Sequence, residues 1–289
     1  MKRRVAYWLA GTALPRHLAR LQGRMRQVAD IDGMGTERAR CVLAPNPSPM
    51  TLDGTNTWIL GEPGASRVVV IDPGPKDGQH LHRVADVVRE SGRTVGAVLL
   101  THGHPDHAAG AVKFAELAGG VSVRALDPRH RLGGEGLSEG DVVTLDGLEV
   151  RVLETPGHSD DSLCFWISGD KAILTGDTVL GYGTTVVDGS LADYLASLDR
   201  LRDFAGTQEA SVILPGHGPK LDDPLGALDY YIDHRRQRLA QVEAAVAAGA
   251  TTAKQVVEQV YADVDKALWP AAEWSVQAQL DYLREAGRI

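Results

Sequence analysis

Four side chains of metal-binding type lie within six consecutive residues of this 289-residue chain. The run is His102-Gly103-His104-Pro105-Asp106-His107, and it follows a short apolar stretch that predicts a β-strand over 95–100. Residues i and i+2 of an extended segment point to the same side, so His102 and His104 can grip one ion. The chain then turns into a helix, where Asp106 and His107 can face a second ion. The run therefore predicts metal binding at a strand-to-helix turn.

Three further candidate ligands each follow a glycine at the end of a predicted strand: His158, Asp177 and His217. Strand ends are where α/β layers build their sites, and a glycine lets the backbone turn tightly there. Five imidazoles and two carboxylates suit zinc, with iron or manganese as alternatives. Because a carboxylate has two oxygens, Asp177 is placed to bridge two ions that hold a hydroxide between them.

These seven residues resemble the pattern of the metallo-β-lactamase superfamily, which is His-x-His-x-Asp-His followed by a distant His, Asp and His. The resemblance implies a mixed α/β (α+β) fold, a four-layer αββα sandwich. It also implies a ligand assignment. The first metal takes His102, His104 and His158, the second takes Asp106, His107 and His217, and Asp177 lies between them. In the expected mechanism the bridging hydroxide attacks an ester-like centre, and Asp106 acts as a catalytic residue that orients it.

Hydrophobic patterning supplies the elements that must position these ligands. Strands are predicted over 57–60, 67–72, 95–100, 121–124, 142–145, 148–153, 163–167, 172–174 and 212–214. Helices are predicted over 80–90, 108–117, 191–204, 225–248, 252–261 and 274–285, with Gly249 and Pro270 as breaks. The pair Asp146-Gly147 predicts a hairpin turn between two of the strands.

The same pattern divides the chain into three parts. Residues 1–40 are rich in arginine and predict a disordered or irregular leader. Residues 41–221 form the predicted catalytic domain, and 222–289 a small helical domain. The segment 46–58, the run 234–238 and the ending 280–289 are similar to the lactamase-beta-2-like, endoribonuclease-like branch of the superfamily. That similarity implies a winged-helix-like C-terminal domain.

Several substrates stay open at this point. Some members of that branch cleave single-stranded RNA, so a phosphodiester is one hypothesis. A glyoxalase-II-like thioester hydrolase and a lactonase, both acting on small molecules, are the alternatives within enzymes. A protein that binds partners through its C-terminal domain is the alternative outside enzymes.

Charge weighs against nucleic acid. The net charge is −8, and residues 222–289 hold seven Lys or Arg against eleven Asp or Glu. An acidic body does not attract a polyanion at long range.

Three residues are candidates for substrate contact. Asn56 precedes the first predicted strand beside Thr55, and the alternative for it is a turn residue. Tyr182, like Tyr194, could donate a proton to a leaving group. Arg235 could hold a phosphate or carboxylate, or lie on the solvated face of a helix.

The remaining expectations concern location. The chain has no apolar run of 18 residues, so no membrane association is expected. Two cysteines, Cys41 and Cys164, suit a cytoplasmic protein. Composition does not indicate the oligomeric state.

Overall fold

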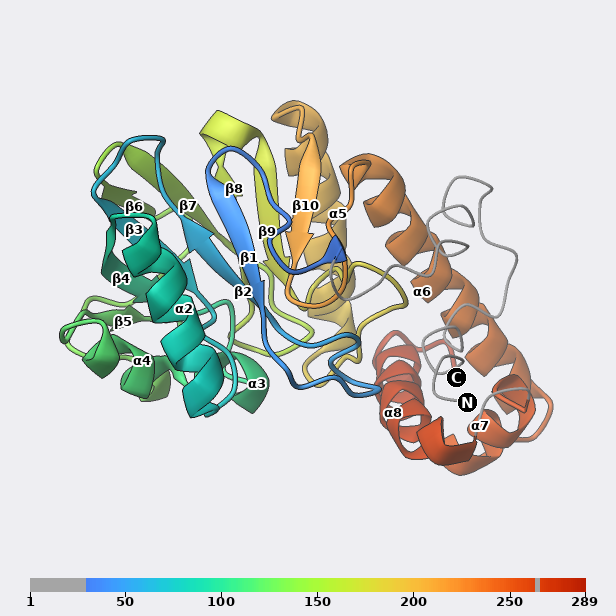
Figure 1. Ribbon diagram of the computed structural model, residues 1–289. Coiled ribbons are helices and arrows are strands. Elements are labelled where there is room, and N and C mark those ends of the chain that lie inside the picture. Colours follow the sequence, from blue (N-terminus) through green and yellow to red (C-terminus); the bar gives the residue numbers. More distant parts are fainter. Residues whose placement is uncertain (1–29, 263–265) are drawn as a thin grey trace.

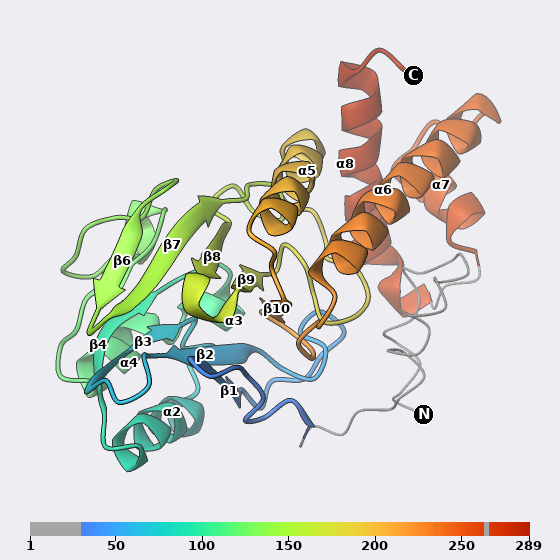
Figure 2. The same cartoon turned by 90° about the horizontal axis from the view of Figure 1, so that it is seen from above.

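The computed structural model describes residues 30–262 and 266–289. Two five-stranded sheets pack face to face at its centre (Figures 1 and 2). The first sheet runs, in order, through β1 (Ala39–Leu43), β2 (Asn56–Leu60), β3 (Arg67–Ile71), β4 (Thr94–Leu99) and β5 (Val123–Arg124). The second runs through β10 (Val212–Pro215), β9 (Ala172–Gly176), β8 (Leu163–Ile167), β7 (Leu148–Glu154) and β6 (Val142–Leu145).

Both sheets are mixed. The pairs β1–β2 and β2–β3 are antiparallel, whereas β3–β4 and β4–β5 are parallel. In the second sheet only β9 and β10 run parallel. The predicted hairpin between β6 and β7 is confirmed, because Asp146 (φ 47°) and Gly147 (φ 94°) both adopt the positive φ that a tight two-residue turn needs.

Strands buried on both faces explain why the fold has four layers. In β8, Leu163, Phe165 and Ile167 point to the core between the sheets, while Cys164 and Trp166 point to the outer helices. Since neither face of such a strand is exposed to water, its sequence is a continuous run of apolar residues. The predicted αββα sandwich is confirmed.

Helices cover both outer faces. Helix α2 (Gly78–Glu90) turns Leu81, Val84 and Val88 onto the first sheet, and the carboxylate of Asp77 caps its first turn. Helix α5 (Leu191–Thr207) covers the second sheet. The predicted helix over 108–117 is instead two pieces, α3 (Pro105–Ala108) and α4 (Ala111–Leu117). Short 3₁₀ turns occupy Pro128–His130, Ser168–Asp170 and Lys266–Leu268.

Three helices follow the sandwich: α6 (Pro224–Ala247), α7 (Ala253–Val260) and α8 (Trp269–Glu285). They share one core with α5 and the second sheet, in which Leu228, Ile232 and Leu280 join Ile173 and Leu198. Figure 2 shows α6 and α8 beyond α5. The last helix begins five residues before the predicted start, because Pro270 is at its first turn, where no backbone N–H is needed.

The predicted leader boundary is wrong at its C-terminal end. Residues 30–40 belong to the sandwich: Ile31 is 1% exposed in the core between the sheets, and Ala39 begins β1. Arg38 forms ion pairs with Glu62 and Asp170, one from each half of the sandwich. The rest of the predicted leader, residues 1–29, lies outside the described residues.

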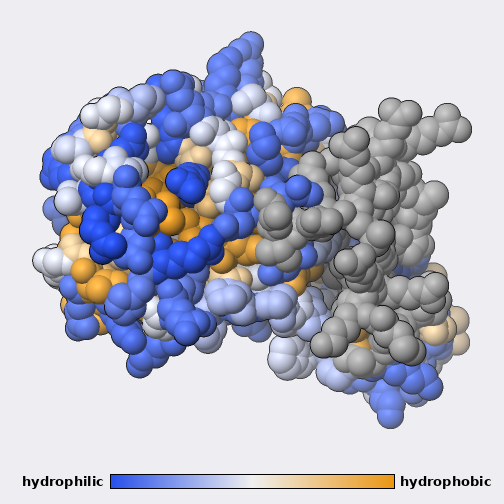
Figure 3. Space-filling view, in the orientation of Figure 1, coloured by the Kyte–Doolittle hydropathy of each residue, from blue (hydrophilic) through white to orange (hydrophobic). Residues whose placement is uncertain are grey.

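On the coloured part of the face shown in Figure 3, hydrophilic side chains predominate and hydrophobic side chains lie in a central strip. Among the described residues, no helix combines the length and the apolar character that crossing a membrane requires.

Candidate metal centre

The ligand loop begins where β4 ends. Thr101 is a bend, and His104 (φ −62°, ψ 144°) is the extended N-cap of α3. Pro105 then starts the helix, where its fixed φ is favourable. The backbone N–H of His107 donates to the carbonyl of His104 at 3.0 Å, which closes the turn. This geometry turns Asp106 and His107 toward the side that His102 and His104 face.

The other three candidates come from the second sheet. His158 follows β7, Asp177 follows β9, and His217 follows β10. The glycines before them are needed for close approach: a Cβ on Gly216 would lie 2.5 Å from Oδ1 of Asp177, and one on Gly176 (φ 47°) would lie 2.7 Å from Oγ1 of Thr101. The ligands that follow the first sheet and those that follow the second are far apart in the sequence, and they meet at one edge of the sandwich.

The structure brings all seven predicted ligands together, six of them in two groups of three with Asp177 beside both. His102, His104 and His158 form the first, and Asp106, His107 and His217 form the second; within each, the possible ligand atoms lie within 4.8 Å of one another. In the first group Nε2 of His158 is 3.0 Å from Nδ1 of His104. In the second, Nε2 of His107 is 3.2 Å from Nε2 of His217.

Asp177 reaches both groups. Its Oδ2 lies 3.2 Å from Nε2 of His217 and 3.7 Å from Nε2 of His158, and its Oδ1 lies 3.4 Å from Nε2 of His107. Asp177 therefore lies between the two groups.

The residues present fit metal ions. Nε2 of His102 and Oδ1 of Asp177 are buried without a hydrogen-bond partner. Burying such atoms without a partner costs about 1–3 kcal/mol each, and a cation would satisfy both. Nitrogen and carboxylate donors in this number suit zinc, iron or manganese.

The carboxylates and imidazoles of the centre shift one another's pKa values. Burial disfavours the charged form of Asp177, but the nearby His217 and His107 hold the pKa of its carboxyl well below the ordinary value. Burial likewise opposes ionisation of Asp106, and His107 and His217 nevertheless lower its pKa to about 2. Burial and the neighbouring His107 lower the pKa of His102 well below its usual range. Both carboxylates are therefore anionic at neutral pH, as ligands must be.

Outer contacts fix the ring orientations. Nδ1 of His107 donates to Oδ2 of Asp72 at 2.8 Å, Nδ1 of His217 to the carbonyl of Gly54 at 3.0 Å, and Nδ1 of His158 to the carbonyl of Val186 at 2.7 Å. Each contact leaves Nε2 facing the centre, which is the orientation that a metal ligand needs. Sequence reasoning missed Asp72, although it follows a buried strand just as the ligands do.

The three candidates for substrate contact lie in different places. Asn56 is fully buried, and its amide donates to the carbonyls of Pro215 and Gly218, so it holds two loops together and does not face the centre. Its neighbour Thr55 lies closer, with Oγ1 3.4 Å from Oδ2 of Asp106. The half-buried Tyr182 donates its hydroxyl to Asp53 at 2.7 Å.

The helical candidates are enclosed. Tyr194 is fully buried and donates to the carbonyl of Thr178 at 2.8 Å, so it is not placed as a proton donor. Arg235 is 4% exposed, which excludes the solvated helix face that sequence reasoning offered as its alternative. Its guanidinium lies against the ring of Tyr194 and the carbonyl of Thr185.

A further group of possible ligands packs behind the loop. Asp127, His130 and Asp161 lie together, half-buried. A Cβ on Gly103 would lie 2.3 Å from Nε2 of His130 and 3.0 Å from Oδ2 of Asp161. Gly103 thus allows these side chains to lie against the outer side of the loop.

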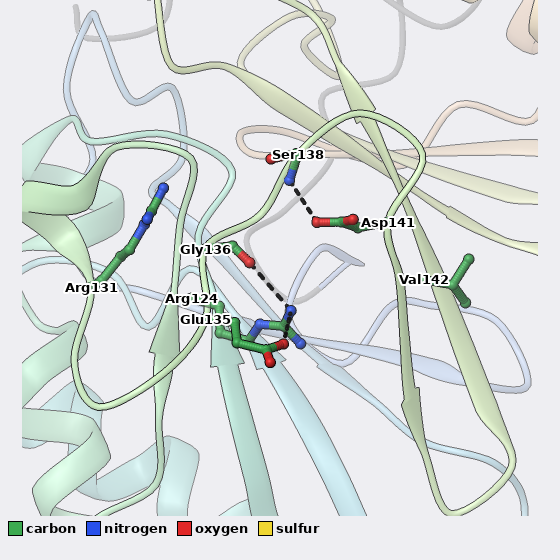
Figure 4. Close-up of a pocket in the computed structure, with 7 residues that line it drawn as sticks. All are labelled: Arg124, Arg131, Glu135, Gly136, Ser138, Asp141 and Val142. Atoms are coloured by element: carbon green, nitrogen blue, oxygen red, sulfur yellow. Dashed lines mark hydrogen bonds and ion pairs between the residues drawn. The ribbon is translucent and has the colours of Figure 1, made fainter.

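A separate polar cavity of about 440 Å³ lies between β5 and β6 (Figure 4). The two arginines that line it donate hydrogen bonds to backbone carbonyls nearby: Arg124 to that of Gly136, and Arg131 to those of Ala125 and Leu126. None of the seven ligands lines it.

The αββα sandwich and the two adjacent ligand groups at its edge are typical of a class of metal-dependent hydrolases. Residues 50–217 match the model of the metallo-beta-lactamase superfamily, and residues 252–289 match that of the beta-lactamase associated winged helix domain. The chain belongs to the metallo-beta-lactamase superfamily and is a hydrolase, and its C-terminal part is a winged helix domain.

Relatives cover nearly the whole chain. It is 32% identical to the Beta-lactamase-like protein 2 homolog of Drosophila melanogaster, over 86% of this chain and 88% of that protein. It is also 32% identical to the Atrochrysone carboxyl ACP thioesterase of Aspergillus fumigatus, over 83% of this chain and 79% of the relative. A solved metallo-beta-lactamase family protein from Thermus thermophilus shares the fold, with a TM-score of 0.71, 24% identity and coverage of 86% of this chain and 94% of that one.

Proposed function

We propose that this protein hydrolyses thioesters of small acyl carriers at a dinuclear zinc centre built from the seven ligands. The observation that supports the centre is the place of Asp177, whose Oδ2 lies near His158 of the first group and His217 of the second, while its Oδ1 lies near His107. Two bound ions would lower the pKa of a water held between them and polarise the carbonyl oxygen of a substrate.

The chain's own residues have distinct roles in this proposal. Asp106 stays ionised and lies 3.2 Å from Nε2 of His217, so it can hold one ion and accept a hydrogen bond from water at the same time. Asp177 fixes the spacing of the two groups. Asp72 and the carbonyls of Gly54 and Val186 prevent the imidazoles from rotating.

Two observations favour a thioester over a phosphodiester. First, a relative that aligns over most of both chains is named as a thioesterase. Second, acidic side chains lie beside the ligands in space or in sequence: Asp188 is 3.6 Å from Nε2 of His104, and Asp53, which accepts from Tyr182, precedes the Gly54 whose carbonyl contacts His217. Acidic side chains in these places repel the phosphates of RNA.

The leaving group supports the same choice. A thiol has a pKa of about 8.5, so a thiolate can leave without a proton donor. An alkoxide leaving group needs one, and the hydroxyls of Tyr182 and Tyr194 are already donated to Asp53 and Thr178.

A substrate panel tests the proposal on purified, zinc-loaded protein. It contains an acyl-glutathione, an acyl-coenzyme A, an aliphatic lactone and a fluorescent single-stranded RNA, with Asp177→Asn as the inactive control. We expect turnover of a thioester that the control loses. Cleavage of the RNA or the lactone alone would contradict the thioester assignment and identify that compound's class as the substrate. Fewer than about two zinc ions per active chain would refute the dinuclear centre.

A further inference from the structure

A buried arginine from the C-terminal helices contacts the backbone beside the metal centre. Arg235 lies on α6 and is 4% exposed. Its Nη2 donates to the carbonyl of Thr185, and its guanidinium carbon lies 5.0 Å from the centre of the Tyr194 ring. Within residues 30–262 and 266–289 it has no ion pair with a carboxylate. A buried charge without a counterion is costly, so its presence requires a reason.

That carbonyl is one peptide away from a contact with His158. Nδ1 of His158 donates to the carbonyl of Val186 at 2.7 Å, and Oγ1 of Thr185 lies 2.9 Å from the same nitrogen. Arg235 therefore holds one carbonyl of a two-residue segment while the next carbonyl orients the ring. The held ring turns Nε2 toward His104 and Asp177.

Helix α6 also contacts the chain shortly before this two-residue segment. The hydroxyl of Tyr231 on α6 accepts from the backbone N–H of Leu180 at 2.8 Å, and Tyr194 on α5 donates to the carbonyl of Thr178. The stretch 178–186, which follows the bridging Asp177, is thus fixed to the two helices at three places. Helix α6 begins after the last ligand, so the centre depends on chain beyond residue 217.

We propose that Arg235 is a positioning residue for His158, acting through Thr185 and Val186. The role rests on the proposed metal centre but is independent of the substrate. It replaces the expectation that Arg235 holds a substrate anion, since a guanidinium enclosed by Tyr194 and Thr185 is not at a substrate surface. A planar guanidinium can stack on a ring and donate in its own plane at once, which an ammonium cannot, so lysine replaces it only in part.

Zinc binding of the full chain tests this role. We compare wild type with Arg235→Met, Arg235→Lys and Thr185→Val, using Arg236→Met as the matched control. Arg236 is the neighbouring residue on α6, its side chain is 65% exposed, and its nearest carboxylate is 3.9 Å away. Zinc affinity is measured by competition with a chromophoric chelator, and kcat and KM on the substrate that the panel identifies.

We expect Arg235→Met to bind one of the two zinc ions about 10-fold more weakly, as loss of an outer contact typically does. Its kcat falls at limiting zinc and recovers when free zinc is raised, while KM is unchanged. Arg235→Lys is intermediate, Thr185→Val loses affinity several-fold, and Arg236→Met matches wild type.

Three results would overturn the role. The first is wild-type zinc affinity in a folded Arg235→Met. The second is a raised KM with unchanged zinc affinity, which would make Arg235 a substrate contact. If Arg235→Met does not fold by circular dichroism, Arg235→Lys decides, and wild-type affinity in that variant is the third. A wild-type chain that binds no zinc refutes the proposed centre itself, whereas unaffected variants of a zinc-binding wild type refute only this role.

Discussion

Asp72 and His107 are joined by a hydrogen bond of 2.8 Å between Oδ2 and Nδ1, and both side chains are completely buried. Oγ1 of Thr101 donates to the same carboxylate oxygen at 2.6 Å, and the backbone N–H of Thr101 donates to the other at 2.8 Å. One carboxylate therefore fixes the start of the ligand loop and the ring at its end. Asp72 does this from a left-handed conformation (φ 48°), which Asp and Asn tolerate better than most residues.

Asp72→Asn should weaken zinc binding about 10- to 100-fold while leaving the fold intact. The amide keeps the shape and tolerates the backbone angle, but it has no charge to attract the His107 ring. Chelator competition measures the loss, and circular dichroism checks the fold. Asp77→Asn is the control, because Asp77 caps the nearby α2 and does not contact the centre. Equal zinc affinity in the two variants would contradict the role given to Asp72.

Asp177→Asn should reduce bound zinc from about two ions to about one per chain and lower turnover by more than about 100-fold. A neutral amide has one oxygen to offer and cannot balance two cations. Mass spectrometry of metal content on dialysed protein, together with kcat, measures both effects. Retention of two zinc ions at wild-type affinity would show that Asp177 does not bridge.

The fold should lose stability in weak acid partly through His80. Burial lowers its pKa to about 4, and its Nε2 lies 2.9 Å from Oγ1 of Thr57. Between pH 6.5 and 4 the unfolded chain takes up a proton that the folded chain does not, so stability falls as pH falls through this range. The contribution reaches on the order of 3 kcal/mol near pH 4.

Urea unfolding of metal-free protein at several pH values measures this effect, with His80→Gln as the comparison. The variant should show a shallower decline in the free energy of unfolding between pH 6.5 and 4.5. Parallel declines in the two proteins would exclude His80 as the cause.

Gly157→Ala should cost about 3 kcal/mol of stability and displace His158. At φ 136° the residue is strained by any side chain, and a Cβ would lie 2.3 Å from Cα of Tyr194, where neither backbone can easily move. Gly119→Ala separates the two effects, because Gly119 has φ 98° but open space around it, and it should cost only about 1 kcal/mol. Thermal unfolding compares the two, and similar losses would mean that crowding against Tyr194 is unimportant.

The strands β2 to β10 could be predicted because they depend on short-range signals, whereas the division of the seven ligands into two groups was implied by the resemblance to the superfamily pattern. Apolar runs mark the strands, and each ligand comes directly after one. Arg38 shows what such signals miss: its ion pair joins it to Asp170, 132 residues later, so nothing nearby indicates that residues 30–40 are folded.

The burial of Arg235 was missed for a related reason. A charged residue in a run of basic residues suggests a solvated face, and only its neighbour Arg236 follows that expectation. Burial of Arg235 depends on Tyr194 and on the loop after Asp177, which reach α6 only in the folded chain.

Each ligand group takes side chains from both halves of the sandwich. His102, His104, Asp106 and His107 follow a strand of the first sheet, while His158, Asp177 and His217 follow strands of the second. Two ions held there would be crosslinks between the sheets, closing long loops of chain much as disulfides do. The two cysteines, Cys41 in the first sheet and Cys164 in the second, are buried free thiols and supply no such link. Removing zinc should therefore loosen one sheet from the other as well as stop catalysis.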